Sequence, residues 1–220
     1  MNQHFVFVHG WGYSPSFWKP LKSRMLDCYI TTVDLGFFTH DPLKTTIPSL
    51  KLQKNVDTSD YVAVGHSLGL FYLLEYFPNS FRRYVAINSF ACFTQQTDFS
   101  NGVADRVLEQ MQKRLANKPK KVLSDFYQQC GEENPVIPDD WNLERLQQGL
   151  EWLKTSNFLD KIQAMKSKLT VIASNNDPIV NIEMTKDSFK NIDIHWFNDL
   201  THLLPHTQIN NCVSILKLLK

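Results

Sequence analysis

Residues 61–69 read YVAVGHSLG, and this stretch decides the fold that we expect. Its first four residues are apolar and rich in valine, which predicts a short buried strand, and the apolar run at residues 68–77 predicts a helix directly after it. Ser67 lies at the junction, between Gly65 and Gly69. So sharp a strand-to-helix turn strains the backbone and needs small neighbours. G-x-S-x-G in this context predicts a nucleophilic serine, with a chance glycine-rich turn as the simpler alternative.

The alternation of strand and helix runs outward from this stretch in both directions, without an internal repeat. Short runs rich in Val, Ile, Phe and Tyr alternate with amphipathic segments, which is typical of βαβ units. Strands are predicted at residues 4–8, 29–34, 61–64, 84–88, 169–174 and 193–197. Helices are predicted at residues 15–26, 68–77, 183–189 and 207–219. We therefore expect an α/β fold with a mostly parallel central sheet of six strands flanked by helices.

Residues 93–160 break this alternation. They are strongly helical in composition, and Pro119, Pro135 and Pro138 divide them into three or four helices. A helical insertion of this kind is expected to lie as a lid over the carboxyl ends of the strands, where ligands bind in open α/β sheets. The expected single domain spans residues 1–220, with a core of residues 1–92 and 161–220.

Composition and charge exclude several classes of partner. Lysine plus arginine total 23 and aspartate plus glutamate 22, so a net charge of +1 provides no global attraction to nucleic acid or an anionic membrane. No apolar stretch reaches the ~20 residues of a membrane-spanning helix. The first eight residues lack the features of a secretory signal, which favours a cytoplasmic monomer. The four cysteines are scattered and form no C-x-x-C pair, so neither a metal nor another cofactor is expected.

A second motif, FVFVHGWG at residues 5–12, runs from a predicted strand into a glycine-rich turn. An oxyanion that forms during acyl transfer needs two backbone N–H donors beside the nucleophile. We assign these donors to Trp11, in the turn, and to Leu68, which follows the nucleophile. The alternative is that His9 and Gly10 form a plain turn. His9 itself is not expected to be catalytic.

An acid and a base follow the nucleophile in the order Ser, Asp, His. Asp177 lies in the loop after the predicted strand at residues 169–174, and His202 lies in the loop after the last predicted strand. We therefore expect His202 to be the general base and Asp177 to orient it. Asp177 before a proline is also typical of a simple turn. His206 is the competing base, but it follows a proline at the start of the terminal helix.

Three further histidines are expected to be structural or solvent-exposed. These are His40, His66 and His195.

Together, the assembled motifs resemble the α/β-hydrolase superfamily and, more narrowly, the pimeloyl-acyl-carrier-protein methyl ester carboxylesterases of biotin synthesis. Residues 9–12 (HGWG), 17–18 (FW), 33–37 (VDLGF) and 149–155 (GLEWLKT) are similar to segments of these esterases.

The chain also departs from that family pattern. His66 stands where these esterases typically have Trp, and Leu70 replaces a second glycine after the nucleophile. The sequence starts directly on the predicted strand before His9, so we expect the antiparallel strands that open most superfamily members to be truncated or missing and the N-terminal edge of the sheet to be shortened. These departures leave the three catalytic candidates in place and concern the shape of the acyl pocket.

The resemblance implies a substrate and its contacts. The substrate would be a methyl ester at the far end of a pimeloyl chain carried on acyl carrier protein, and hydrolysis would release methanol. Trp11, Phe126 and Trp152 are the candidate contacts with the acyl chain, although core packing explains such aromatic residues equally well. Other hydrolases with the same triad, such as a general carboxylesterase, a thioesterase or a carbon–carbon bond hydrolase, remain alternatives, as does a non-enzymatic binding protein.

A basic cluster in the expected lid is the candidate docking site for the acidic carrier. It consists of Lys113, Arg114, Lys118, Lys120 and Lys121. A solvated helix face explains such a cluster as often as a docking site does. Lys121 matches a lid cation of the esterases that the chain resembles, whereas Asp125 falls where those esterases have Arg.

Overall fold

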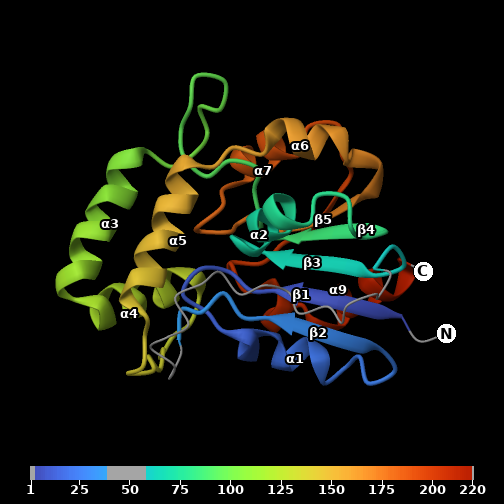
Figure 1. Cartoon of the computed structure of the whole chain (residues 1–220), viewed down its shortest axis with the longest axis horizontal. Coiled ribbons are helices and arrows are strands. Elements are labelled where there is room, and N and C mark those ends of the chain that lie inside the picture. The colour runs from blue at the N-terminus through green and yellow to red at the C-terminus, as the bar shows by residue number, and fades with distance from the viewer. Residues whose placement is uncertain (1–2, 39–57, 220) are drawn as a thin grey trace.

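The computed structural model describes residues 3–38 and 58–219, and a parallel sheet lies at its centre (Figure 1). Its six strands run in the order β2-β1-β3-β4-β5-β6, and every pairing between them is parallel. The strands are β1 (His4–Val8), β2 (Tyr29–Val33), β3 (Val62–His66), β4 (Arg83–Ile87), β5 (Leu169–Ser174) and β6 (Ile194–Phe197). The predicted fold class is therefore confirmed.

The central strands are apolar because helices cover both faces of the sheet. Phe5, Val6, Phe7 and Val8 of β1 are fully buried, as are all five residues of β3. A strand buried on both faces reads as a continuous hydrophobic run and not as an alternation. This explains why the stretch around the glycine-flanked serine stands out so clearly in the sequence.

Short helices cover the two faces of the sheet. They are η1 (Pro15–Trp18), α1 (Lys19–Lys22), α2 (Gly69–Tyr76), α6 (Leu159–Ala164), η2 (Lys166–Lys168), α7 (Ile182–Ser188), α8 (Leu204–Thr207) and α9 (Ile209–Leu218). The chain leaves β1 toward β2 but leaves β3 toward β4, so right-handed connections place α1 and α2 on opposite faces. Helices α8 and α9 pack with α1, whereas α2 packs on β3 and β1. The connections therefore change direction between β1 and β3, and ligands bind at the carboxyl ends of the strands at such a point in open α/β sheets.

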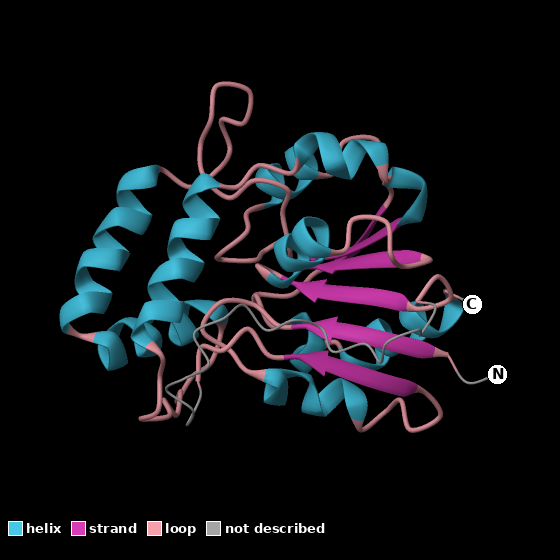
Figure 2. Ribbon diagram, in the orientation of Figure 1, coloured by secondary structure: helices cyan, strands magenta, loops and turns pink. Residues whose placement is uncertain are grey.

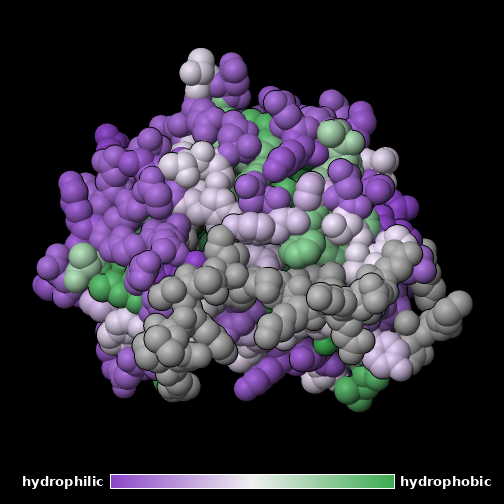
Figure 3. Space-filling view, in the orientation of Figure 1, coloured by the Kyte–Doolittle hydropathy of each residue, from purple (hydrophilic) through white to green (hydrophobic). Residues whose placement is uncertain are grey.

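Three longer helices lie beyond the carboxyl ends of the strands, on the left in Figures 1 and 2. They are α3 (Asp105–Asn117), α4 (Pro119–Cys130) and α5 (Leu143–Thr155), and α3 packs against the other two. Pro119 opens α4 at a position where its missing N–H is tolerated. The outer surface on this side is mainly hydrophilic (Figure 3). We refer to these three helices as the lid.

The predicted helix at residues 15–26 is wrong in its second half. The structure has a 3-10 turn followed by α1, which ends at Lys22. Ser23 Oγ donates a hydrogen bond to the Pro20 carbonyl (2.7 Å), and such a bond competes with the hydrogen bonds of a helix. Leu26 is 88% exposed, so the last apolar residue of the predicted helix does not face the core. The terminal helix likewise begins earlier than predicted, as α8 and α9.

The predicted strand at residues 61–64 extends further than expected, because its pairing with β4 continues to His66.

No helix within the described residues is long and apolar enough to cross a membrane.

The close packing of α2 against β1 generates a stability prediction. A β carbon on Gly69 would lie inside contact distance of the Val8 carbonyl oxygen and 2.8 Å from the Val8 carbonyl carbon. We expect Gly69→Ala to lower the free energy of unfolding by about 2 kcal/mol or more, because the backbone must move to relieve the clash. Equilibrium unfolding in urea measures this change. Glu75→Ala, at an exposed position of the same helix, should change stability by less than about 0.5 kcal/mol. Equal stability of the two variants would contradict the prediction.

Candidate active site

Ser67 occupies the sharp turn between β3 and α2. Its backbone is left-handed (φ +52°), a conformation that is strained for a residue with a side chain. The Ser67 N–H donates to the Ile87 carbonyl (3.1 Å), and Ser89 Oγ donates to the Ser67 carbonyl (2.7 Å). A β carbon on Gly10 would lie 3.0 Å from Ser67 Cβ, so the loop after β1 approaches the serine closely. The strained conformation is thus held by the end of β4 and by this loop.

Asp177 and His202 form a buried hydrogen-bonded pair. His202 Nδ1 donates to Asp177 Oδ2 (2.7 Å), and both side chains are almost completely buried. The other carboxylate oxygen, Oδ1, accepts the backbone N–H groups of Ile179 (2.8 Å) and Val180 (3.0 Å). These bonds fix the acid after β5. A proton on Nδ1 leaves the other imidazole nitrogen as the basic one.

That second nitrogen, His202 Nε2, is buried and has no hydrogen-bond partner within the described chain. Ser67 Oγ does not bond to it in this structure. Bonds between a nucleophile and its base are often long without substrate and shorten in the reacting complex. His202 Nε2 therefore keeps the unused lone pair that the predicted general base requires.

The loop that carries His202 is held by three other elements. The His202 N–H donates to the Cys130 carbonyl (3.0 Å), and Thr201 Oγ1 donates to the same oxygen (2.8 Å). Asn88 Nδ2 donates to the Thr201 carbonyl (3.2 Å), and His66 Nε2 donates to the His202 carbonyl (2.9 Å). The candidate base is consequently positioned by the end of lid helix α4, by the end of β4 and by the residue before Ser67.

The end of α4 has the conformation that this contact needs. Gly131 follows the helix in a left-handed conformation (φ +109°), which is a common helix terminus. A β carbon there would lie 2.7 Å from Thr201 Oγ1. The last carbonyl groups of a helix lack partners within the helix, so the Cys130 oxygen can accept hydrogen bonds from the loop that carries His202.

Sequence reasoning missed the positioning contacts of Asn88, Thr201 and Cys130, and it assigned no specific contact to His66. Asn88 lies at the end of β4 with φ +43°, and asparagine is one of the few residues that tolerate this region. An asparagine directly after a buried strand is the local feature of the sequence that could have pointed to Asn88. The contacts themselves join residues far apart in the chain, which no local pattern shows.

The two predicted oxyanion donors lie in the loop after β1 and directly after Ser67 in the chain. The backbone N–H groups of Trp11 and Leu68 have no hydrogen-bond partner in the part of the chain that the structure describes. Leu68 precedes α2, where the positive end of the helix dipole favours developing negative charge. Trp11 Nε1 donates to the Leu146 carbonyl of α5 (2.9 Å), and Tyr127 of α4 donates its hydroxyl proton to the Gly12 carbonyl. The lid therefore also holds the loop after β1.

The remaining histidines have other partners. His9 Nε2 accepts the Leu35 N–H (3.1 Å), so its proton lies on Nδ1, which donates to the Gly10 carbonyl (2.9 Å). His206 Nε2 donates to the Phe17 carbonyl (2.8 Å), and no contact joins it to Asp177. Burial lowers the pKa of both His66 and His206, which keeps them neutral near pH 7. His195 is exposed, and His40 lies outside the described residues.

The predicted substrate contacts fall in two places. Phe126 of α4 packs edge-on against Trp11, with 5.0 Å between ring centroids. Trp152 of α5 packs against Phe71 (6.2 Å) and Tyr76 (6.3 Å) of α2. Phe126 therefore lies beside the loop of the oxyanion donors, whereas Trp152 joins the lid to α2. Their roles as substrate contacts stay predictions.

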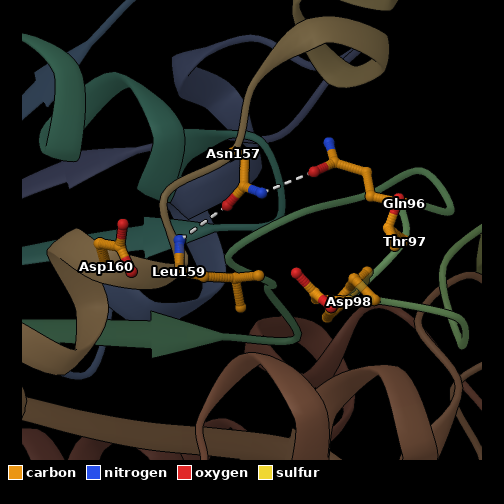
Figure 4. Close-up of a pocket in the computed structure, with 7 residues that line it drawn as sticks. Gln96, Thr97, Asp98, Asn157, Leu159 and Asp160 are labelled. Atoms are coloured by element: carbon orange, nitrogen blue, oxygen red, sulfur yellow. Dashed lines mark hydrogen bonds between the residues drawn. The ribbon is translucent and has the colours of Figure 1, made fainter.

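A polar pocket of about 590 Å³ lies away from the serine, where the chain enters and leaves the lid (Figure 4). It is lined by Gln96, Thr97, Asp98, Phe99, Asn157, Leu159 and Asp160. Asn157 Nδ2 donates to Gln96 Oε1 (2.6 Å), and the Leu159 N–H donates to Asn157 Oδ1 (3.0 Å). These contacts hold the loop of residues 94–103 to the segment before α6. No cluster of three or more metal-ligating side chains occurs within the described residues.

The basic cluster is partly neutralised by neighbouring acids. Asp125 accepts from Arg114 (2.7 Å) and Lys121 (2.5 Å), and these cations lower the pKa of its carboxyl group. Lys120 pairs with Asp139 (2.8 Å). Lys113 and Lys118, the other two members, form no ion pair with a described residue. The charge that the lid presents to a partner is consequently smaller than the sequence alone indicates.

Comparisons with known proteins agree with this architecture. The sequence profile of the alpha/beta hydrolase family matches residues 5–208. No curated protein sequence matches the chain.

Similar solved structures include an esterase from Exiguobacterium antarcticum (15% identity, TM-score 0.79, 98% of this chain and 91% of that one). A hydrolase from Oleispira antarctica is 12% identical (TM-score 0.77, 99% and 90% covered), and an enol-lactonase from Burkholderia xenovorans is 11% identical (TM-score 0.76, 100% and 91% covered). Identities this low show the fold alone. Because the family profile covers nearly the whole chain, the protein belongs to the alpha/beta hydrolase family.

Proposed function

We propose that this protein is a serine hydrolase that cleaves carboxylic ester bonds. The observation that carries the proposal is the buried Asp177–His202 pair, whose Nε2 has no partner, in a family member with Ser67 at the strained turn. The unpartnered N–H groups of Trp11 and Leu68 add the donors that acyl transfer requires. A binding protein has no need of this combination.

The proposed reaction proceeds through an acyl-enzyme. Ser67 Oγ attacks the ester carbonyl carbon while His202 Nε2 takes the hydroxyl proton, and Asp177 stabilises the resulting imidazolium. The oxyanion of the tetrahedral intermediate accepts the N–H groups of Trp11 and Leu68. When the intermediate collapses, the alkoxy group leaves as an alcohol with the proton from His202. Water, deprotonated by His202, then releases the acid and restores Ser67.

For the substrate, we propose a pimeloyl methyl ester carried on acyl carrier protein, in biotin synthesis. The HGWG motif and the lid segment at residues 149–155 support this choice by resemblance, and Phe126 beside Trp11 provides an apolar surface near the donors. Arg114, Lys120 and Lys121 form ion pairs within the protein, so Lys113 and Lys118 are the members of the cluster that we propose to contact the carrier. A general carboxylesterase is the second candidate, because the superimposable structures include an esterase. Rescue of a biotin-requiring strain that lacks its methyl ester carboxylesterase separates the two, since a soluble chain that fails to rescue is not the biotin enzyme.

Enzyme kinetics provide the first test of Ser67 as the nucleophile. Ser67→Ala should lower kcat/KM for p-nitrophenyl butyrate by at least about 10³-fold with little loss of stability, because the hydroxyl group serves chemistry and not core packing. Initial rates and a thermal melt measure both quantities. Ser214→Ala, at an exposed position of α9, is the matched control and should retain wild-type rates. A Ser67→Ala rate within tenfold of wild type would refute the nucleophile assignment.

The two candidate bases can be compared directly. His202→Ala should lose as much activity as Ser67→Ala, and the double variant should lose little more, because residues of a triad act as a unit. His206→Ala should keep activity within about tenfold, since its ring nitrogen only holds the Phe17 carbonyl. The same ester assay applies to all three variants. If His206→Ala abolished activity while His202→Ala did not, the base would be misassigned.

The structure sharpens a test of carrier docking. Lys113 and Lys118 are the members of the basic cluster without an ion pair to a described residue, so Lys113→Glu with Lys118→Glu reverses charge without breaking a pair. We expect kcat/KM for a carrier-linked methyl ester to fall about tenfold at low salt and that for p-nitrophenyl butyrate to stay unchanged. Lys166→Glu with Lys168→Glu, outside the lid, is the control pair. Equal effects on both substrates, or none on the carrier-linked ester, would show that the cluster does not dock the carrier.

A further inference from the structure

A buried arginine of the lid has two hydrogen-bond donors that nothing in the described chain uses. Arg145 lies in the first turn of α5, and only 7% of its surface is exposed. Its Nη1 donates to Gln148 Oε1 (2.7 Å), whereas Nε and Nη2 are buried without a partner. Burying a guanidinium without a counter-charge is costly, so the protein gains stability if an anion occupies this position.

The two unused nitrogens form one edge of the guanidinium group. Nε–H and one N–H of Nη2 point in parallel directions, and this fork matches the two oxygens of a carboxylate. Gln148 holds Nη1, the nitrogen on the opposite side. The bond to Gln148 therefore orients the plane of the group and leaves its parallel donors for a ligand.

A glycine borders this edge. Gly36, in the loop after β2, has a left-handed backbone (φ +80°), and a β carbon on it would lie 3.6 Å from Arg145 Nε. This is ordinary van der Waals contact, so the loop after β2 lies directly against the guanidinium group. The carboxylate of Asp34 in the same loop accepts the Gly36 N–H through Oδ1 (2.8 Å).

The acid directly before Arg145, Glu144, acts on its charge. Glu144 Oε1 accepts from Gln148 Nε2 (3.0 Å), so this acid contacts the amide and not the guanidinium. Tyr76 and Tyr72 of α2 are the other titratable groups that act on it, and tyrosine is neutral at pH 7. Burial lowers the pKa of Arg145, but an arginine stays charged at any physiological pH.

We propose that Arg145 is the centre of a carboxylate-binding site at the junction of α5, α2 and the loop after β2. A carboxylate has one negative charge, which matches the one guanidinium, whereas a phosphate monoester has about −1.5 to −2 at pH 7. The carbonyl of the next residue, Leu146, accepts a hydrogen bond from Trp11 Nε1. A carboxylate bound to Arg145 would therefore lie near the contact that holds the loop after β1. The proposal does not rest on ester hydrolysis, and its test needs no activity.

Arginine side-chain NMR tests the site directly. Sodium propionate is titrated into the full-length protein at constant ionic strength, with sodium chloride as the balancing salt. We expect the Nε–H resonance of Arg145 to shift saturably and Tm to rise by about 5 °C or more at a ligand concentration about 100-fold above Kd. Arg145→Gln should abolish the rise in Tm. Arg145→Lys, which keeps the charge without the fork, should weaken binding at least about tenfold.

Arg114→Gln is the matched control, because this lid arginine is exposed and paired with Asp125. It should keep the full response to propionate. An unshifted Arg145 resonance, or an equal rise of Tm in Arg145→Gln, would overturn the site. A response to sodium phosphate at lower concentration than to propionate would overturn the carboxylate assignment. If Arg145→Gln failed to fold, the wild-type resonance alone would decide.

Discussion

The contact between the end of β1 and the turn at Ser67 is the constraint on which the rest of the structure depends. Gly69 packs against the Val8 carbonyl, and Gly10 packs against Ser67 itself. The two glycines let the loop after β1 and the start of α2 lie side by side. The loop that carries Trp11, one predicted donor, therefore lies close to the turn that carries Ser67 and Leu68, where the sheet connections change direction. The strain at Ser67 persists because the Ile87 carbonyl at the end of β4 holds its N–H group and Ser89 Oγ holds its carbonyl.

The lid contributes to the site as a support as well as a cover. The Cys130 carbonyl at the end of α4 holds the loop of His202, while Tyr127 and the Leu146 carbonyl hold the loop of Trp11. Both halves of the proposed machinery consequently depend on lid helices. A shift of α4 or α5 would move the base and the oxyanion donors together, so substitutions in the lid can change kcat as well as substrate binding.

The sequence allowed the fold to be predicted well because each strand carries its own local signal. The continuous apolar runs of β1 and β3 exist because both faces are covered, and the glycines at 65 and 69 are required by close packing. Asp177 and His202 were predicted from their places in the loops after two predicted strands, in the chain order Ser, Asp, His. The end of the helix after Pro15 was missed, since the bond from Ser23 to the Pro20 carbonyl competes with helical hydrogen bonds.

The parts that the sequence did not predict are contacts between distant segments. Asn88, Thr201 and Cys130 meet only after the lid packs on the core, and no period or motif links their positions. Arg145 lies among polar residues of an amphipathic helix, so its sequence context indicates a solvated side chain and not a buried one. The pairing of Asp125 with Arg114 and Lys121 similarly depends on how α3 and α4 pack.

The central claim is that the Asp177–His202 pair activates Ser67, and covalent trapping tests it most directly. The folded protein is treated with a fluorophosphonate, digested and mapped by peptide mass spectrometry. The account predicts one phosphonyl adduct, on the peptide that contains Ser67, and a labelling rate at least about 10³-fold lower in His202→Ala. An adduct on a different residue, or equal labelling of Ser67 without His202, would contradict the account.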